Sequence, residues 1–419
     1  MKKLKKNDKK NNKVLYPVIL VLLLVVSFVV RYQDLEQKDT EYREMLQKAR
    51  TDAQDGLVDK ALEYYDQALV IRDTPEIRIE RAQVLIDDER STEAVSYIEQ
   101  CRSSDADEGK YYSFLFNEYK AEEKYEEFYK LYLRAKRAGV LNDEMKALEK
   151  SVQYKYYFGD GIYEDVGEFR GEHCAVESNG LWGYVDYSGE TTIDPIYLSA
   201  GAFCSSEAPI QTEKGQWYYI DAEGTRIDKT TEEDSAKYVW NGVQVLKDDD
   251  GYYLADGDGK EYQWENPDDT LPSRYDAVAT DMYGMSLFND RVFLHFDGSY
   301  HLVTSKGEII DTEAILDAKP FQDEDGLAAV MIGDAWGFMD KDGNVVIAPQ
   351  YEDAKSSCSG LAGVMMNNKW GYVTVDGDMA IEPIFDDIRD MSPKTIAFVY
   401  QANMWRILKF YKNDVLGGE

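Results

Sequence analysis

The side chains that most often carry chemistry are few and scattered along this chain of 419 residues. The histidines do not cluster in the sequence, and the cysteines show neither a CxxC pair nor the spacing of metal ligands. These residues are His173, His295, His301, Cys101, Cys174, Cys204 and Cys358. The sequence contains no GxSxG, HExxH, Walker A or dinucleotide-binding glycine pattern. We therefore predict no catalytic residues, no metal ligands and no cofactor, and we expect that the protein is not an enzyme.

Carboxylates are abundant, and their densest group lies in KDDDGYYLADGDGKE, residues 247–261. Aspartates in such number are typical of calcium loops, since Ca²⁺ prefers carboxylate oxygens. The segment lacks the glycine at position six of a twelve-residue calcium loop with a terminal glutamate. Its aspartates fall in two turns of a repeat, so we expect solvated turns. Elsewhere no flanking pattern marks out a glycosidase-like pair of carboxylates.

An aromatic residue recurs along the second part of the chain and would organise any site there. The aromatic anchors are Trp182, Trp217, Tyr252, Tyr300, Trp336, Trp370 and Trp405. Their spacing is 34 to 36 residues, except for 48 residues between Tyr252 and Tyr300, where we predict an insertion after Trp264. Six anchors are followed seven residues later by a glycine, namely Gly189, Gly224, Gly259, Gly307, Gly343 and Gly377. This period indicates a repeat architecture.

Each residue type that recurs in the repeat has a structural explanation. The aromatic anchor begins an alternating run that is typical of a strand, and its ring is large enough to fill a layer between neighbouring repeats. The Asp-x-x-Gly that follows suits a hairpin loop, because Asp caps its own backbone and Gly adopts positive φ. An Ile-x-Pro-x-aromatic element comes next, at residues 193–197, 347–351 and 381–385. Proline is tolerated there if the strand lies at a sheet edge.

The Trp-Gly pairs end at Gly183, Gly337 and Gly371, and the pattern resembles the WG-repeat (KWG-repeat) family over about residues 160–412. The other repeats are recognised more by their spacing along the chain than by their residue types. The resemblance implies a β-rich repeat domain of a kind common in bacterial surface and secreted proteins. It also implies binding to other molecules, without a general set of catalytic residues.

The phase of the repeats predicts how the domain closes. Residues 161–176 match residues 349–364, so the domain begins with a spare strand element, whereas after Trp405 the chain ends without one. An N-terminal strand that completes the last unit would remove both exposed edges. We therefore predict a propeller-like ring of about seven three-stranded blades. An open β-solenoid is the alternative.

Residues 32–150 are predicted to be helical throughout, with apolar residues at i, i+3 and i+4. A 33–34 residue period and alternating small and large residues resemble tetratricopeptide repeats over about residues 40–150. The positions that carry this resemblance are Gly56, Ala61, Tyr65, Ala68, Ala82, Ala94, Phe128, Tyr132 and Ala135. It implies a stack of helix pairs with a concave face for a peptide or protein. Generic antiparallel helical hairpins are the alternative.

The N-terminus is basic and then apolar. Residues 1–13 are rich in lysine, and residues 14–30 form a charge-free run of 17 residues that ends at Arg31. This run is at the lower limit for a membrane-spanning helix. We predict an uncleaved single-pass transmembrane signal anchor, with the basic tail in the cytoplasm and the body outside. A cleaved signal peptide is the alternative, although no good cleavage site follows.

The rest of the chain is strongly acidic. The chain carries −33 and its first 31 residues carry +7, so the remaining 388 residues carry −40. Nucleic-acid binding requires clustered Lys and Arg, so we predict no nucleic-acid partner.

The sequence as a whole predicts a multidomain protein with an α part and an all-β part. Its order is the cytoplasmic tail, the anchor, tetratricopeptide-like helices at 32–150 and the WG-repeat β-domain at 155–412. We expect a bacterial protein of the cell membrane with its bulk extracytoplasmic. Its expected function is that of a non-catalytic scaffold or binding protein that engages a protein or cell-envelope ligand. The alternatives are an envelope-glycan hydrolase with a carboxylate dyad on the β-domain, and a structural spacer in a membrane complex.

Overall fold

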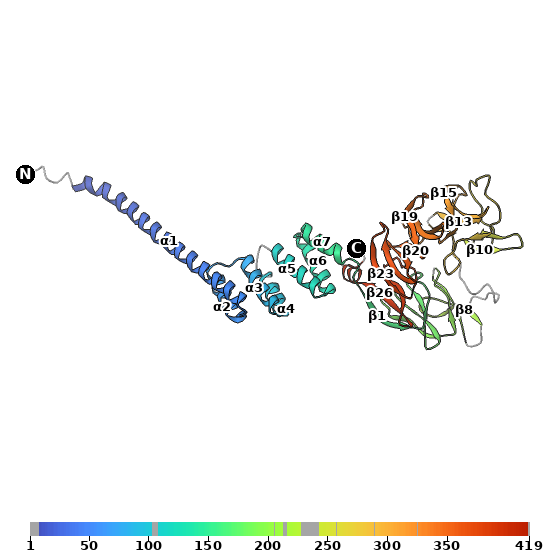
Figure 1. Ribbon diagram of the computed structural model, residues 1–419, viewed down its shortest axis with the longest axis horizontal. Coiled ribbons are helices and arrows are strands. Elements are labelled where there is room, and N and C mark those ends of the chain that lie inside the picture. The colour runs from blue at the N-terminus through green and yellow to red at the C-terminus, as the bar shows by residue number, and fades with distance from the viewer. Residues whose placement is uncertain are drawn as a thin grey trace, which may run out of the picture. The chain divides into compact units, whose positions relative to one another are not determined.

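The computed structural model describes residues 8–102, 108–204, 206–212, 216–227, 243–256, 258–288, 290–324 and 326–417. The chain divides into two compact units, residues 1–152 and residues 153–419. The first is helical and the second consists mostly of β-sheets (Figure 1).

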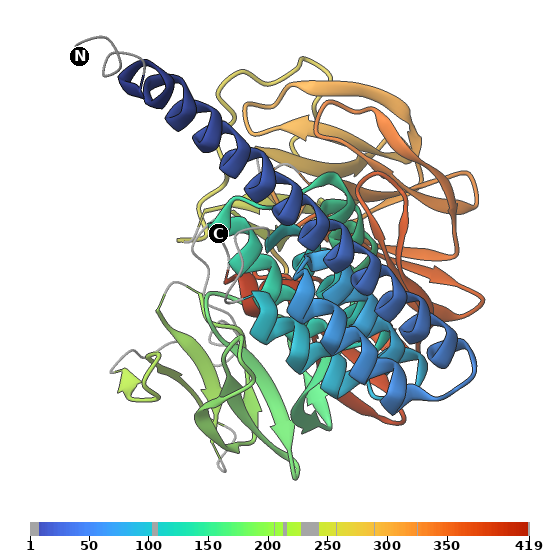
Figure 2. The same cartoon turned by 90° about the vertical axis from the view of Figure 1, so that its left-hand side faces the viewer.

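The helical unit contains seven helices among its described residues. They are α1 (Asp8–Gln54), α2 (Val58–Ile71), α3 (Pro75–Asp87), α4 (Ser91–Arg102), α5 (Glu108–Ala121), α6 (Tyr125–Ala138) and α7 (Asp143–Val152). Consecutive helices pack on one another from α1 to α6, and α7 packs on α5 (Figure 2). Small residues permit this close packing, since Ala61, Ala82 and Ala94 are fully buried. The tetratricopeptide-like character of these helices stays a prediction.

The predicted transmembrane anchor at residues 14–30 is wrong. These residues are part of the single 47-residue helix α1. In the part of the chain that the structure describes, no helix is long and apolar enough to cross a membrane. The physical reason is the length of the apolar run within α1. Its 17 residues extend about 25 Å as a helix, whereas the hydrocarbon core of a membrane is about 30 Å thick. The membrane partner and the single-pass, N-in localisation at the cell membrane, which were inferred from this run, are therefore corrected too.

The second unit forms seven sheets in its described residues, which we call blades 1 to 7 in chain order. Blade 1 contains β2 (Asp165–Val166), β3 (Cys174–Ser178), β4 (Leu181–Val185) and β5 (Thr191–Tyr197). Blade 2 contains β6 (Ser199–Ala200), β7 (Ala208–Gln211), β8 (Trp217–Ile220) and β9 (Arg226–Ile227). In blade 3 the described residues form two strands, β10 (Gln244–Lys247) and β11 (Tyr252–Ala255).

The later blades again have four strands each. Blade 4 contains β12 (Ala277–Val278), β13 (Arg291–Phe296), β14 (Ser299–Thr304) and β15 (Ile309–Ile315). Blade 5 contains β16 (Asp317–Ala318), β17 (Ala328–Ile332), β18 (Ala335–Met339) and β19 (Val345–Tyr351). Blade 6 contains β20 (Asp353–Cys358), β21 (Leu361–Met366), β22 (Lys369–Thr374) and β23 (Met379–Phe385). Blade 7 contains β24 (Asp387–Ile388), β25 (Ala397–Gln401), β26 (Met404–Phe410) and β1 (Tyr156–Tyr163), and the short helix α8 (Tyr411–Leu416) follows it.

The first strand of the unit closes the last blade. Strand β1 pairs antiparallel with β26, as the phase of the repeats predicted. Blade 1 in turn contacts blades 2 and 7, and blades 3 to 7 each contact the next. Figure 1 shows the blades following one another around a common centre, so the unit is propeller-like.

The prediction of three strands in each blade is wrong, because six of the seven described sheets have four. The strand that sequence reasoning missed is the first of each blade. In blades 1, 2, 4, 5 and 7 it has only two residues, as in Asp165–Val166. Two residues are too few for an alternating pattern, so they look like part of a loop.

The glycine of the Trp-Gly pair is explained by the outer strand of the blade. A Cβ on Gly337 would lie 2.6 Å from the carbonyl oxygen of Ile347 and 2.8 Å from the nitrogen of Pro349. Gly183 and Gly371 face the outer strand in the same way. The pairing register shifts at this point, which brings the Ile-x-Pro backbone close to the neighbouring strand.

The cores of the unit lie between neighbouring blades. Trp336, Trp370 and Trp405 are at most 6% exposed, and each belongs to a buried cluster that includes residues of the next blade around the ring. A single repeat therefore cannot bury its own apolar face, and the ring as a whole is the folding unit.

Candidate functional site

The repeat residues singled out from the sequence have structural positions. The seven anchors lie in β4, β8, β11, β14, β18, β22 and β26, one in each blade. The glycines seven residues later, from Gly189 to Gly377, all have positive φ in the turns that follow. In the helical unit Ala61, Tyr65, Ala68, Ala82, Ala94, Phe128 and Ala135 are buried, Tyr132 is half-buried, and Gly56 has positive φ after α1. Two of the anchors, Trp370 and Trp405, line one open pocket of about 610 Å³ between blades 6 and 7, and the seven anchors as a set do not form one site.

A pocket of about 240 Å³ lies where the loops that follow the first strands of several blades meet. We call it the central pocket. Its lining comes from the loops after β2, β16 and β24, from the end of β20 and from the turn after β4. The lining residues are Glu168, Phe169, Arg170, Gly171, Tyr187, Gln322, Cys358, Asp390, Met391, Ser392 and Pro393.

Glu168 is the most unusual group in this pocket. It is only 7% exposed, and its carboxyl group makes no hydrogen bond or ion pair with any described residue. Burial raises the pKa of Glu168 to about 7, and the charge of Asp390 acts in the same direction. Lys355, Arg170 and Arg389 act against this shift. The carboxyl group is thus poised between its neutral and charged forms near neutral pH.

The carboxylate of Asp390, unlike that of Glu168, is paired with neighbouring side chains. Its Oδ1 lies 3.3 Å from Nζ of Lys355, and its Oδ2 accepts a hydrogen bond of 3.2 Å from Nε2 of Gln322. Burial lowers the pKa of Lys355, but the carboxylates of Asp390 and Glu168 outweigh burial, so the pKa is raised overall. Lys355 is therefore charged and holds Asp390 in place.

A loop of blade 4 contacts the segment of blade 1 that forms one wall of the central pocket. Asp281, whose side chain is fully buried, forms an ion pair with Arg170. The hydroxyl of Tyr283 accepts a hydrogen bond of 2.7 Å from the backbone N–H of Glu168 and donates one of 3.2 Å to its carbonyl oxygen. A Cβ on Gly167 would lie 2.5 Å from that hydroxyl, so glycine is needed for the approach. These contacts fix the backbone that carries Glu168.

A second tie joins the last blade to the first. Nε of Arg389 donates a hydrogen bond of 3.0 Å to the carbonyl oxygen of Val166, and the same guanidinium lies 4.1 Å from the ring centre of Trp405. Lys319 and Lys355 lie over Trp336 and Trp370 in blades 5 and 6.

Sequence reasoning missed the residues of the central pocket. A signal for the basic ones was present, because Asp-Ala-Lys occurs at 317–319 and 353–355, and Asp-Ile-Arg occurs at 387–389. The aspartate of each tripeptide accepts a hydrogen bond from the next backbone N–H, which starts the first strand of the blade. No signal marked Glu168, because its character depends on burial among distant segments.

The acidic segment and the cysteines have plain structural roles. Oδ1 of Asp248 accepts hydrogen bonds from the backbone N–H groups of Asp250 and Gly251, and Asp256 caps the next turn in the same manner. Among the described residues no group of His, Cys, Asp and Glu could hold a metal ion. The four cysteines, all within the described ranges, form no disulfide.

The arrangement offers one carboxyl group, that of Glu168, which is unpaired in the described part of the chain and lines a partly aromatic pocket. Such a group can bind a polar or cationic part of a ligand, or can exchange a proton near neutral pH. Acid–base cleavage of a glycosidic bond would require a second carboxyl group that is equally available.

Comparison with known families supports the repeat assignment. Residues 182–207, 336–370 and 370–405 match the family model described as WG containing repeat. These matches cover parts of blades 1, 2 and 5 to 7 and include all three Trp-Gly pairs. A comparison with curated proteins found no match.

Solved structures that resemble the chain are distant. They include BamB from Moraxella catarrhalis, at 12% identity and a TM-score of 0.32, covering 60% of this chain and 86% of BamB. Hsv2p of Kluyveromyces lactis has 10% identity and a TM-score of 0.34, and the match covers 58% of this chain and 90% of Hsv2p. The WD40 β-propeller domain of Doa1 has 11% identity and a TM-score of 0.30, with 61% and 96% covered. These scores are too low to support a fold or a function, so the propeller-like assignment rests on the strand pairing described above. What the comparisons establish is that the β-unit of this chain contains WG repeats.

Proposed function

We propose that this chain is a non-catalytic binding protein whose central pocket takes a polar group of a protein ligand. The observation that carries the proposal is Glu168, a buried carboxyl group that lines the central pocket and has no hydrogen-bond or ion-pair partner among the described residues. A buried polar group left unpaired costs free energy, and a ligand that pairs with it removes that cost.

The surroundings of Glu168 support binding over catalysis. The neighbouring carboxylate of Asp390 is held by Lys355 and Gln322, and that of Asp281 is held by Arg170. The pocket is therefore rigid and preorganised, which reduces the entropy lost on binding. The tetratricopeptide-like helices would provide a second surface for a protein, since stacked helix pairs commonly bind peptides.

The test is an affinity capture with the immobilised full chain, read by mass spectrometry. The variants are Glu168→Gln, which keeps the shape of the side chain, and Glu190→Gln, which removes a carboxylate from an exposed turn. We expect a protein that the wild type and Glu190→Gln retain at moderate salt and that Glu168→Gln loses. Equal retention by all three proteins would rule out the central pocket as the binding site.

A glycan hydrolase is the second candidate, because a carboxyl group with a pKa of about 7 suits a general acid. The same variants separate it from the first. Under this alternative the wild type cleaves a soluble glycan fragment, Glu168→Gln does not, and Glu190→Gln retains activity. Absence of cleavage by the wild type would remove this alternative.

A further inference from the structure

Blade 3 departs from the other blades in a way that creates a second pocket. After β11 the chain leaves the sheet, and residues 260–275, which we call the insert, lie where the other blades continue with their outer strand. The insert returns through isolated bridges that pair Ala255 with Glu261 and Tyr252 with Tyr275. A pocket of about 280 Å³ lies between the insert and β11. We call it the insert pocket.

The insert is firmly attached to blade 4. The backbone N–H of Asn266 donates a hydrogen bond of 2.8 Å to Lys306, and that of Asp268 donates one of 2.9 Å to Gly307. The hydroxyl of Tyr262 donates a hydrogen bond of 3.0 Å to the carbonyl oxygen of Ser305. A Cβ on Gly307 would lie 2.8 Å from Cα of Pro267, so this glycine of the repeat also permits the insert to dock. The pocket wall is therefore preformed.

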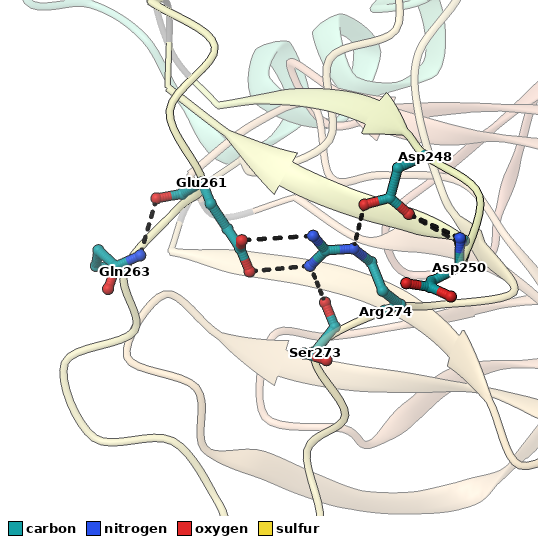
Figure 3. Close-up of polar contacts among 7 residues, drawn as sticks. Asp248, Asp250, Glu261, Gln263, Ser273 and Arg274 are labelled. Carbon is teal, nitrogen blue, oxygen red and sulfur yellow. Dashed lines mark hydrogen bonds and ion pairs between the residues drawn. The ribbon is translucent and has the colours of Figure 1, made fainter.

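Arg274 holds the other end of the insert (Figure 3). Its Nε lies 2.8 Å from a carboxylate oxygen of Asp248, and its terminal nitrogen lies 2.9 Å from one of Glu261. It also donates a hydrogen bond of 2.7 Å to the carbonyl oxygen of Ser273. Its guanidinium stacks over Tyr253, 4.4 Å from the ring centre. One arginine thus joins the two ends of the insert to each other and to the turn between β10 and β11.

The chemistry of the insert pocket restricts its ligand. None of the described residues that line it is Lys, Arg or His, so it offers no cation for a phosphate or carboxylate ligand. Its one carboxylate, Glu261, is neutralised by Arg274, so the pocket does not select a cation. The ligand that fits is therefore uncharged.

The walls add a second restriction. Tyr253, Tyr262, Trp264 and Tyr275 line the pocket, and the rings of Tyr262 and Trp264 meet edge to face at 5.0 Å. Gln263 donates a hydrogen bond of 3.0 Å to the carbonyl oxygen of Glu261, which leaves its own side-chain oxygen as an acceptor. The hydroxyl of Tyr253 makes no hydrogen bond in the described part of the chain. A sugar ring has apolar C–H faces for aromatic rings and hydroxyl groups for such polar atoms.

We propose that the insert pocket binds one uncharged sugar residue of a glycan. Its volume is slightly below the about 300 to 1,000 Å³ of typical small-ligand pockets, which suits a single ring. Trp264 is the platform, Gln263 and Tyr253 bind hydroxyl groups, and Arg274 is a positioning residue that keeps the walls together. This site is separate from the central pocket, and neither proposal depends on the other.

The experiment titrates the full chain with cellotetraose, maltotetraose and chitotetraose, using isothermal titration calorimetry and tryptophan fluorescence. We expect at least one of these sugars to bind with a dissociation constant of about 1 mM or below. Trp264→Ala is expected to weaken that binding about tenfold or more, which corresponds to about 1.4 kcal/mol. Gln263→Ala, at an exposed position, is expected to weaken it without disturbing the insert.

Tyr218→Ala is the control for the loss of an aromatic ring outside the insert pocket. Tyr218 lies in blade 2 under the guanidinium of Arg226, as Tyr253 lies under that of Arg274 in blade 3. Tyr218→Ala and Glu168→Gln are expected to bind the sugar as the wild type does. The proposal is overturned if none of the three sugars binds at about 10 mM, a concentration tenfold above the expected constant. It is also overturned if binding is unchanged in both Trp264→Ala and Gln263→Ala, or if an uncharged peptide rich in aromatic residues occupies the pocket in place of the sugars.

Discussion

Blades 5 and 6 keep the Trp-Gly pair. In blade 3, Tyr252 and Tyr253 stand in place of this pair, and the insert stands in place of the outer strand. In blades 5 and 6 the aromatic anchor is buried between neighbours, and the outer strand covers the glycine. In blade 3 the anchor Tyr252 is half-buried, and the insert takes the place of the outer strand. In blades 5 and 6 the Trp-Gly pair thus helps to hold the ring together, whereas in blade 3 the insert that replaces the outer strand forms a pocket.

The largest difference is expected between two tryptophans. Trp370→Ala removes a buried indole from the core between blades 6 and 7 and should lower the free energy of unfolding by about 4 kcal/mol. Trp264→Ala, in the insert pocket, should lower it by about 1 kcal/mol or less. Denaturant unfolding of the full chain, followed by tryptophan fluorescence, reports on the β-unit because all seven Trp lie there. Equal losses would contradict the division between structural and site-forming blades.

The residue after the anchor should show the same contrast at a smaller scale. Gly371→Ala places a Cβ against the backbone of Ile381 and Pro383 and should cost about 2 to 3 kcal/mol. Tyr253→Ala changes the corresponding residue of blade 3, where no outer strand lies opposite, and should cost about 1 kcal/mol. The same unfolding measurement checks both variants. A cost below about 0.5 kcal/mol for Gly371→Ala would mean that the outer strand can move aside.

The central pocket should make stability depend on pH. The pKa of Glu168 is about 7 in the folded protein, against 4.5 for a glutamate that is exposed to water. The folded state thus binds more protons between these values, so stability falls as pH rises from about 4.5 to about 7. Glu168→Gln cannot ionise and should therefore be more stable than the wild type by about 2 to 3 kcal/mol at pH 8, relative to the difference at pH 4.

Unfolding midpoints at pH 4 and pH 8 measure this effect, and Glu190→Gln controls for the loss of one carboxylate. A wild-type protein whose stability relative to Glu168→Gln does not change with pH would show that Glu168 is solvated.

The smallest expected effect is the loss of an aspartate cap in a hairpin turn. This loss should cost the same free energy of unfolding in blade 5 as in blade 3. Oδ1 of Asp340 accepts hydrogen bonds of 2.9 Å from the backbone N–H groups of Asp342 and Asn344. Asp256 accepts the corresponding bonds from Asp258 and Lys260. Asp340→Ala and Asp256→Ala should each cost about 1 kcal/mol in unfolding experiments at neutral pH.

Partial burial raises the pKa of Asp340, but hydrogen bonds to the charged form outweigh it, so the pKa is lowered. The difference between wild type and Asp340→Ala should therefore shrink as pH falls through that lowered pKa. A much larger cost in one blade would show that the turns are not equivalent.

The sequence predicted the repeat because its signals are local, and it predicted the closure because the repeats begin with one spare element and end without it. Period, hairpin turns and the Trp-Gly pair are written within each unit of about 35 residues, and the spare element at residues 161–176 indicated that β1 would pair with β26. The two-residue first strands were missed because they are too short for a pattern. The anchor at residues 14–30 was predicted from composition alone, although its length was marginal.

The sequence by itself determined that an all-β repeat follows a helical segment, that glycine and aspartate form the turns, and that one repeat carries an insertion. Only the tertiary structure decided where function can lie. Glu168, Lys355 and Asp390 are up to 222 residues apart and meet only because the ring brings together loops of blades 1 and 7 and the first strand of blade 6. The insert likewise becomes a pocket wall only through its contacts with blade 4. Local hydrogen bonds and steric limits are encoded residue by residue, whereas burial and charge environment depend on which distant segments the ring brings together.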